Sequence, residues 1–168
     1  PGIVALGKPM GDGHPIAGLA ARANVLDGFG EKVRYFNTFG GNPVSCAAGM
    51  AVLKVIREEG LQKNALEVGQ YMRQELRSLA NKHQIIGDVR GAGLFIGIEL
   101  VLDQTTKTVA TDEAEQLVNG LFRKRILISR AGTGGNILKI RPPLPFSKEN
   151  ASFFVEMVDE VLKDMTSK

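Results

Sequence analysis

The sequence predicts an α/β protein, and three observations on the 168-residue chain support this fold class. Apolar residues alternate with polar or small ones in "LFIGIEL" (94–100), which is typical of a strand with one buried face. In other stretches apolar residues recur at helical spacing. The composition, 43% hydrophobic and 23% charged, is that of an ordinary globular protein. The length suits one domain or two incomplete ones.

Two short strands and two helical stretches are expected in the first part of the chain. "IVAL" (3–6) predicts a buried strand, and "PIAGLAAR" (15–22) a second one after a loop rich in glycine and proline. A short helix follows near 22–29, and then a polar, aromatic loop leads to Pro43, which is well placed in the first turn of a helix. The apolar spacing, interrupted by one glycine, predicts two helices or one kinked helix over 43–82.

The second part of the chain has the pattern of a small α/β unit in the order strand, helix, strand, strand, helix. Thr111 is expected to cap the middle helix, with two acidic residues in its first turn, and Ser147 to cap the last one. Pro142–Pro143 must end the strand before that last helix. We therefore expect residues 1–60 to be the tail of another domain and residues 61–168 to form the small domain. The predicted elements are a strand at 94–100, a helix at 111–124, a strand at "RILIS" (125–129), a turn at "RAGTGGN" (130–136), a strand at "ILKIR" (137–141) and a helix from Ser147.

Charge and cysteine content exclude several classes of protein. The net charge of +3 is mild, and the densest basic cluster, "RKR" (123–125), is too short for a nucleic-acid footprint. No apolar run approaches the ~20 residues of a membrane span, so we expect no membrane partner. A single cysteine, Cys46, excludes an intrachain disulfide and fits a reducing compartment, which predicts a cytoplasmic protein. Because His14 and His83 are far apart, we expect no metal site.

Lys8 directly follows the first predicted strand, at the end where α/β sheets place their ligands. Gly7, Gly11 and Gly13 leave the loop around it without side chains, which permits a ligand to approach the backbone closely. A lysine that reacts with a carbonyl needs its neutral amine, which partial burial favours. Residue type alone favours a solvated turn lysine, and the setting makes the two interpretations about equal. A nucleotide-binding loop does not fit, because Pro15 stands where its helix would start.

Two further stretches offer groups for an anion. In "YFNTFGGNP", Asn37 and Thr38 carry hydrogen-bonding side chains, and Gly40–Gly41 expose backbone N–H groups ahead of a helix, which suits a phosphate. In "ILKIR", Lys139 and Arg141 point to the same face of a strand, ~6–7 Å apart, and could clamp a carboxylate or a phosphate. Taken alone, a capping turn and an edge strand with a basic outer face explain these stretches as well or better.

Taken in order and spacing, four stretches resemble the C-terminal part of a class III (omega-type) aminotransferase. They are "IVALGKPMGDGHPIAG", "NTFGGNPVSCAAG", "DVRGAGLFIGIEL" and "ILKIRPPLPFS". These enzymes use pyridoxal 5'-phosphate (PLP) and have the fold of aspartate aminotransferase, fold type I. The resemblance thus implies that residues 1–60 are the C-terminal tail of the large PLP-binding domain and residues 61–168 the small domain. Within the class, the first two stretches are most similar to the alanine–glyoxylate aminotransferase 2-like branch, which also contains phospho-lyases.

The resemblance implies roles for four residues. Lys8 matches the lysine that forms a Schiff base with the cofactor aldehyde and then shuttles a proton between substrate and cofactor. Thr38 matches the threonine that hydrogen-bonds the cofactor phosphate from the neighbouring subunit, which implies a homodimer with shared active sites. Lys139 stands where many relatives hold the arginine for the substrate carboxylate, and Arg141 shares its face. Because lysine cannot make the bidentate fork of an arginine, this difference favours an amine or phosphorylated-amine substrate.

The resemblance also implies that part of the site lies outside this chain. In this fold the aspartate for the pyridine nitrogen, the ring-stacking aromatic residue and the main phosphate-binding loop all precede the lysine. The chain by itself is therefore expected to be a poor catalyst or none. It opens on "PGIVALGKP", without a methionine and just ahead of a strand, which indicates a piece of a longer protein and leaves organelle targeting upstream open.

Three functional interpretations stay open at this point. The first is an aminotransferase that moves an amino group from an amine or amino acid to an oxo-acid through a Lys8 Schiff base. The second keeps PLP but eliminates phosphate from phosphoethanolamine or phosphohydroxylysine. The third is a non-catalytic α/β dimerisation module that has retained these residues.

Overall fold

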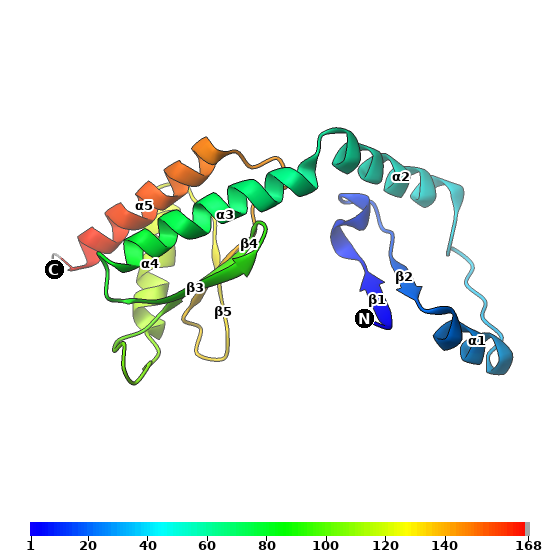
Figure 1. The fold of residues 1–168 in the computed structure, drawn as a ribbon, viewed down its shortest axis with the longest axis horizontal. Helices are drawn as coiled ribbons and strands as arrows, with labels where there is room; N and C mark the ends of the chain where they lie inside the picture. The colour runs from blue at the N-terminus through cyan, green and yellow to red at the C-terminus, as the bar shows by residue number, and fades with distance from the viewer. Residues whose placement is uncertain (167–168) are drawn as a thin grey trace. The chain divides into compact units, whose positions relative to one another are not determined.

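The computed structural model describes residues 1–166, and the chain divides into two compact units, Pro1–Glu59 and Gly60–Lys168. In the first unit, β1 (Ile3–Leu6) pairs with β2 (Gly18–Ala21) in a two-stranded antiparallel sheet. A short 3-10 turn, η1 (Lys8–Gly11), lies between these strands, and the helices α1 (Ala23–Lys32) and α2 (Pro43–Glu58) follow (Figure 1). Both predicted strands, and the start of a helix at Pro43, are confirmed.

β1 is not buried in this unit, and here the prediction from the sequence is wrong. Ile3, Val4 and Leu6 are 53%, 40% and 49% exposed. A strand buries a face only against a second layer, and α2 contacts the turn η1 instead of covering the sheet. The residues that α2 buries are Ser45 and Gly49. The apolar side chains of this unit are thus left without a covering layer within the described residues.

The second unit is a four-stranded antiparallel sheet whose strands contact the helices α3 and α4, and α5 packs against these two helices. The strands lie in the order β3-β4-β6-β5, so β6 lies between β4 and β5, and β5 is an edge strand. Figure 1 shows α3 and α5 running side by side in this unit, and the two helices are in contact. The elements are α3 (Leu61–Ala80), β3 (Ile86–Ala92), β4 (Phe95–Leu100), α4 (Thr111–Arg123), β5 (Ser129–Ala131), β6 (Ile137–Ile140) and α5 (Lys148–Thr166).

The core of the second unit lies between the helices and one face of the sheet. In β4, Ile98 and Leu100 are fully buried, whereas Phe95 is 61% exposed. Met72 of α3 and Leu117 of α4 are fully buried in the same cluster. Because successive side chains of a strand point to opposite faces, the other face of the sheet stays open. Among the described residues, no helix has both the length and the apolarity to cross a membrane.

The alternation predicts one strand at 94–100, whereas the structure has a hairpin of two strands, β3 and β4, over residues 86–100. Gly91 and Gly93 have φ angles of +146° and +52°, which side chains rarely allow. Gly91 lies near the end of β3, and Gly93 lies in the turn between β3 and β4. The period-two pattern of β4 is confirmed. β3 has no such pattern, because its register shifts between Ile86 and Asp88, and an irregularity of this kind breaks the alternation.

The helix boundaries confirm one predicted cap and correct another. Ser147 caps α5 as predicted, since its Oγ accepts a hydrogen bond from the Asn150 N–H at 3.2 Å. At α4 the cap position belongs to Ala110, and the Thr111 hydroxyl donates to the carbonyl of Gly134 instead. Thr111 therefore ties the start of α4 to the loop before β6, rather than capping its own helix.

The segment "RILIS" is not a strand over its predicted length. The N–H groups of Lys124 and Ile126 donate to carbonyls in the last turn of α4, and Arg125 is left-handed with φ +63°. These residues are thus used to end the helix. The strand β5 begins only at Ser129 and runs into the predicted turn. On α3, by contrast, Gly60 (φ +62°) precedes the first residue, so the region predicted as two helices or one kinked helix contains two.

Candidate active site

Lys8 is exposed in the turn between β1 and β2, where its backbone is left-handed with φ +44°. Asp12 (φ +47°) and Gly13 (φ +99°) are left-handed as well. A hydrogen bond from the Met10 N–H to the Gly7 carbonyl, 3.2 Å long, closes the turn around the lysine. A left-handed conformation costs a residue with a side chain roughly 1–2 kcal/mol. The surrounding loop therefore holds Lys8 in a strained conformation, as is common at functional sites.

A side-chain hydrogen bond joins the lysine loop to the start of α2. His14 Nε2 lies 2.9 Å from the Ser45 Oγ, which is 31 residues further along the chain. Asn42 caps α2 by accepting from the Ser45 N–H at 2.9 Å, and its Nδ2 donates to the Ser45 Oγ at 3.0 Å. Ser45 is only 8% exposed, so this three-residue network fixes the loop that carries Lys8 against α2.

Thr38 lies in the turn before α2, and the bonding of this turn differs in part from the prediction. The Asn37 Oδ1 accepts from the N–H groups of Phe39 and Gly40, at 3.1 and 2.9 Å. The Gly40 N–H is therefore engaged within the turn and is not available to an anion. Gly41 has φ +70°. The Thr38 side chain is exposed, and its hydroxyl has no hydrogen-bond partner within the described residues.

Aromatic residues precede and follow Thr38 in the sequence, and their side chains are not buried. Tyr35, Phe36 and Phe39 are 70%, 83% and 80% exposed. Tyr35 stands edge-on to Phe29, with ring centroids 6.2 Å apart. Apolar rings gathered in one exposed loop are typical of a surface that contacts another polypeptide.

Lys139 and Arg141 belong to the second unit, on and just beyond β6. The neighbouring residues of the strand, Leu138 and Ile140, are 0% and 5% exposed and face the core. By alternation Lys139 faces the open side of the sheet, opposite Gly97 of β4. Within the described residues, neither Lys139 nor Arg141 has an ion-pair partner.

The acidic groups on the open face are already paired with a third cation. Arg90 donates to Asp88 at 2.8 Å and also to Glu99, the two carboxylates that flank it. These hydrogen bonds, the one with Asp88 first, raise the pKa of Arg90 above its usual value. Asp88 and Glu99 are therefore occupied, and Lys139 and Arg141 remain as the uncompensated charges.

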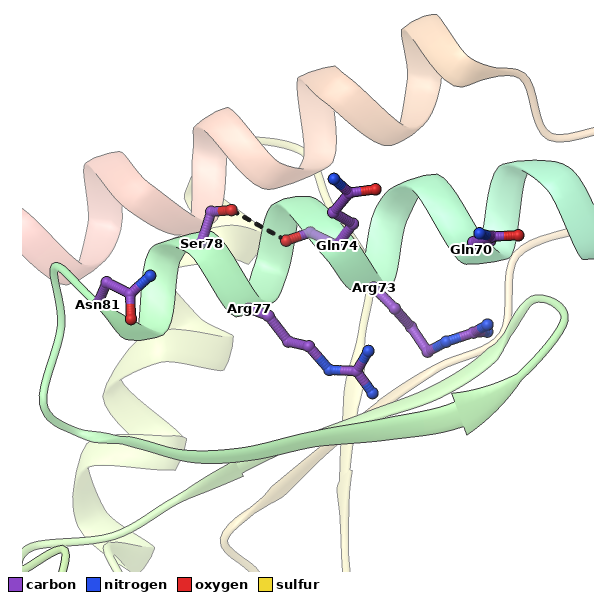
Figure 2. A pocket seen from close by; sticks show the side chains of 6 residues that line it. All are labelled: Gln70, Arg73, Gln74, Arg77, Ser78 and Asn81. Carbon is purple, nitrogen blue, oxygen red and sulfur yellow. Dashed lines mark hydrogen bonds between the residues drawn. The ribbon is translucent and has the colours of Figure 1, made fainter.

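A groove along α3 holds none of the four candidate residues. It has a volume of about 490 Å³, and Figure 2 shows Arg73 and Arg77 reaching from α3 toward β3. Arg73 donates to the carbonyl of Gly93 at 3.2 Å, and Arg77 to that of Val89 at 3.1 Å. β3 is an edge strand, so these arginines cover backbone carbonyls that a sheet edge would otherwise expose.

Within each unit, the structure thus assembles part of what the sequence suggested. The first unit holds Lys8 and Thr38, and the second holds Lys139 and Arg141. The sequence analysis missed the bond between His14 and Ser45. The one available signal was "NPVS", since an asparagine followed by proline and, three residues on, a serine is typical of a capped helix start.

The chain was compared with protein families, with curated proteins and with solved structures. The model of the family Aminotransferase class-III matches residues 1–162. The chain belongs to this family. Among curated relatives, the mitochondrial alanine–glyoxylate aminotransferase 2 homolog 2 of Arabidopsis thaliana is 44% identical over 98% of this chain and 34% of its own length. The chain thus spans about a third of the length of the curated relatives it matches.

Two solved structures show the fold of this class-III aminotransferase chain, and the second of them indicates the cofactor. A phospholyase from Arthrobacter in complex with phosphoethanolamine is 40% identical, with a TM-score of 0.92, over 97% of this chain and 39% of its own. A PLP-bound amine transaminase from an uncultivated Pseudomonas species is 27% identical, with a TM-score of 0.85, over 98% and 38%. The fold is that of the PLP-dependent type I enzymes, and the cofactor indicated is PLP. Both predictions are confirmed.

Proposed function

We propose that this chain supplies the reactive lysine of a PLP-dependent aminotransferase, which moves an amino group from an amine or amino acid to an oxo-acid. The observation that carries this proposal is the turn around Lys8. The residue is exposed, strained at φ +44° and fixed to α2 through His14 and Ser45. Its placement after β1 in a chain of the class-III family supports the role of the lysine that reacts with the cofactor.

The residues present fit PLP in the part of the site that this chain contains. A Cβ added at Gly7 or at Gly13 would meet no atom within 4 Å, so the loop before and after Lys8 leaves room for a flat ring. The free hydroxyl of Thr38 is a suitable donor to a phosphate. When bound, PLP supplies an aldehyde carbon and an electron-withdrawing ring. The Lys8 amine would hold the cofactor at that carbon and, once released, move a proton at the substrate carbon.

The test is reduction of the PLP-loaded, full-length protein with borohydride, followed by peptide mapping. We expect the label on Lys8. Lys8→Ala should abolish labelling and lower kcat by at least about 10²–10⁴-fold, the range for loss of a positioned proton-transfer group. Lys54→Ala, an exposed lysine on α2, is the matched control and should leave both unchanged. PLP binding without a trapped adduct at Lys8 would refute the role, and no PLP binding at all would favour the non-catalytic dimerisation module.

A second candidate activity is elimination of phosphate from phosphoethanolamine or phosphohydroxylysine. Lys139 and Arg141 favour it, because two uncompensated cations on one sheet face match a dianion better than a single carboxylate. The similarity to a phospholyase bound to phosphoethanolamine agrees with this reading. The two activities separate in one assay of the full-length enzyme. Phosphate released without an oxo-acid indicates the lyase, and amino transfer that requires an oxo-acid indicates the aminotransferase.

We further propose that the protein acts as a homodimer in which Thr38 contacts the PLP phosphate bound by the other subunit. The exposed rings of Tyr35, Phe36 and Phe39 support an interface at this loop, because they flank Thr38 and nothing in the described residues covers them. The partners of the reaction are small molecules, the amino donor and the oxo-acid.

A cytoplasmic location is also a proposal, supported by the single free cysteine, Cys46. The mitochondrial name of the Arabidopsis relative makes an organelle the alternative. Microscopy of a fluorescent fusion of the full-length protein decides between them.

A further inference from the structure

The contact that carries a further inference is the one between Arg141 and Phe95. Ile140 of β6 pairs with Ile96 of β4, so the next position on each strand places Arg141 opposite Phe95. The Arg141 Cζ lies 6.0 Å from the centroid of the Phe95 ring. This distance is at the outer end of the range in which a cation is attracted to the face of an aromatic ring. Phe95 is 61% exposed, on the face of the sheet that the helices leave open.

Among the residues that the structure describes, no carboxylate forms an ion pair with the Arg141 guanidinium. The carboxylates of Asp88 and Glu99 are both bound by Arg90. Lys139, two residues away and on the same face, adds a second positive charge. The Phe95 ring is therefore the contact that the structure gives the guanidinium within the described residues.

We propose that Phe95 is a positioning residue that holds the Arg141 guanidinium ready to bind the anionic group of the substrate. This inference rests on the proposed function, in which Arg141 and Lys139 bind that group. A guanidinium held against a ring keeps its planar fork of N–H donors in one orientation, which a bidentate oxyanion requires. Without the ring the long side chain would sample several rotamers, and anion binding would have to restrict them at a cost in affinity.

The position of Phe95 makes this role selective for one part of the substrate. The residue directly follows the turn at 93–94, so its backbone is fixed by the hairpin. Gly97, the next residue of β4 on the same face, has no side chain, and a Cβ there would lie 3.2 Å from the Cγ2 of Ile137. Phe95 should thus influence the anion of the substrate, and not the reacting amine.

The experiment compares Phe95→Leu with Phe95→Tyr in the PLP-loaded, full-length protein. Leucine removes the ring, whereas tyrosine keeps it. With phosphoethanolamine as the probe, we expect Phe95→Leu to raise Kd about 2- to 30-fold, the range of an exposed to a desolvated cation–ring contact. Phe95→Tyr should keep Kd for phosphoethanolamine at its wild-type value. Kd for ethanolamine, which lacks the anion, should not change. Phe122→Leu, at a 65% exposed phenylalanine on α4, is the matched control.

A second measurement tests the geometry independently of the activity. In protein labelled with ¹⁵N-arginine, the Arg141 Nε–H signal, assigned by its loss in Arg141→Gln, should carry a ring-current shift that Phe95→Leu removes and Phe95→Tyr retains. In addition, Phe95→Leu combined with Arg141→Gln should weaken phosphoethanolamine binding no more than Arg141→Gln alone.

The inference is overturned if Phe95→Leu and Phe95→Tyr have the same Kd for phosphoethanolamine, or if Kd for ethanolamine changes in parallel. It is also overturned if the double variant binds phosphoethanolamine more weakly than Arg141→Gln does. Failure of the proposed function gives a different result. In that case Arg141→Gln leaves phosphoethanolamine binding unchanged, while the ring-current shift of Arg141 still follows the residue at position 95.

Discussion

At the scale of single residues, Lys8 combines a reactive side chain with a backbone conformation that lysine disfavours. Its φ of +44° lies in the region that glycine adopts without a steric penalty. The chain keeps a lysine there although glycine would fit better. We interpret the strain as the consequence of requiring an amine at this point of the loop.

This strain predicts an opposition between stability and function. Lys8→Gly and Lys8→Ala both remove the amine, but only glycine relieves the backbone. We expect Lys8→Gly to have a free energy of unfolding about 1 kcal/mol higher than Lys8→Ala, as measured by urea denaturation. At Lys54, inside α2, the order should reverse, because glycine is the poorer helix former. Equal stabilities of the two Lys8 variants would contradict the left-handed assignment.

Asp159 of α5 is a second residue whose chemistry is set by its neighbours. Its Oδ1 is 2.6 Å from the Nε2 of His83, which is 7% exposed, and its Oδ2 accepts from Lys163 at 2.8 Å. The hydrogen bond with His83, and then that with Lys163, lowers the pKa of Asp159 below its usual value of 3.8. The stabilising contribution of this carboxylate is therefore complete above its unfolded pKa and is lost as the pH falls through the lower, folded value.

We accordingly expect Asp159→Asn to lower the free energy of unfolding at neutral pH by about 1.5–3 kcal/mol, the range for hydrogen bonds to a charged group. The loss should shrink as the pH falls below 3.8, where the carboxylate is protonated in the unfolded chain, and should disappear as the pH falls through the lower pKa of the folded state. Urea unfolding between pH 3 and pH 7 measures both effects. Asp164→Asn on the same helix serves as the control, and a constant difference across that range would contradict the prediction.

At the scale of elements, close contacts between backbones decide which residues are tolerated. Gly69 of α3 packs against the turn between β3 and β4, where a Cβ on residue 69 would lie 1.9 Å from the Gly93 carbonyl oxygen. Neither backbone can move without separating α3 from the hairpin. Gly28 of α1 is the opposite case, because a Cβ there would meet no atom within 4 Å.

Gly69→Ala should therefore destabilise the protein by about 1–3 kcal/mol or more, the usual cost of inserting atoms into a packed site. Gly28→Ala should instead be neutral or stabilising by up to about 1 kcal/mol, because alanine favours the helix. Thermal and urea denaturation of the two variants give the comparison. A Gly69→Ala variant as stable as the wild type would mean that α3 and the hairpin are further apart.

The elements also show which features a sequence can predict. Alternation and helical spacing found β4 and α4, because each has one face in the core. They could not find β3, in which a register shift breaks the alternation, or the start of β5, where residues after α4 are used to end the helix. At the site, residue type and setting singled out Lys8, whereas the partnership of His14 with Ser45 depends on folding across 31 positions. Pairings of that kind leave little trace in a single sequence.

At the scale of the whole molecule, the charges and exposed rings of the two units indicate what they lack. Within the described residues, the first unit presents Lys8, Thr38 and exposed aromatic rings, and the second presents Lys139 and Arg141, neither of which has an ion-pair partner. The family match and the cofactor of its members supply a common explanation, since a PLP site needs a lysine, phosphate donors and an anion site for the substrate. The proposed sharing of the site between subunits would account for the exposed loop around Thr38.

Sharing of the site predicts that two defective variants complement each other. If Thr38 serves the site of the other subunit, a heterodimer of Lys8→Ala with Thr38→Ala holds one site with both native residues and one with neither. Thr38→Ala alone should bind PLP roughly 10- to 100-fold more weakly, as expected for a lost hydrogen bond to a charged group. At limiting PLP, the purified heterodimer should then recover roughly half of the wild-type activity, since one of its two equivalent sites is intact. Differently tagged subunits allow its isolation, and a heterodimer of Lys8→Ala with the wild type is the control. If Thr38 served its own subunit, every site of the first heterodimer would lack one residue. Its activity would then stay at or below that of Thr38→Ala, which would contradict the shared site.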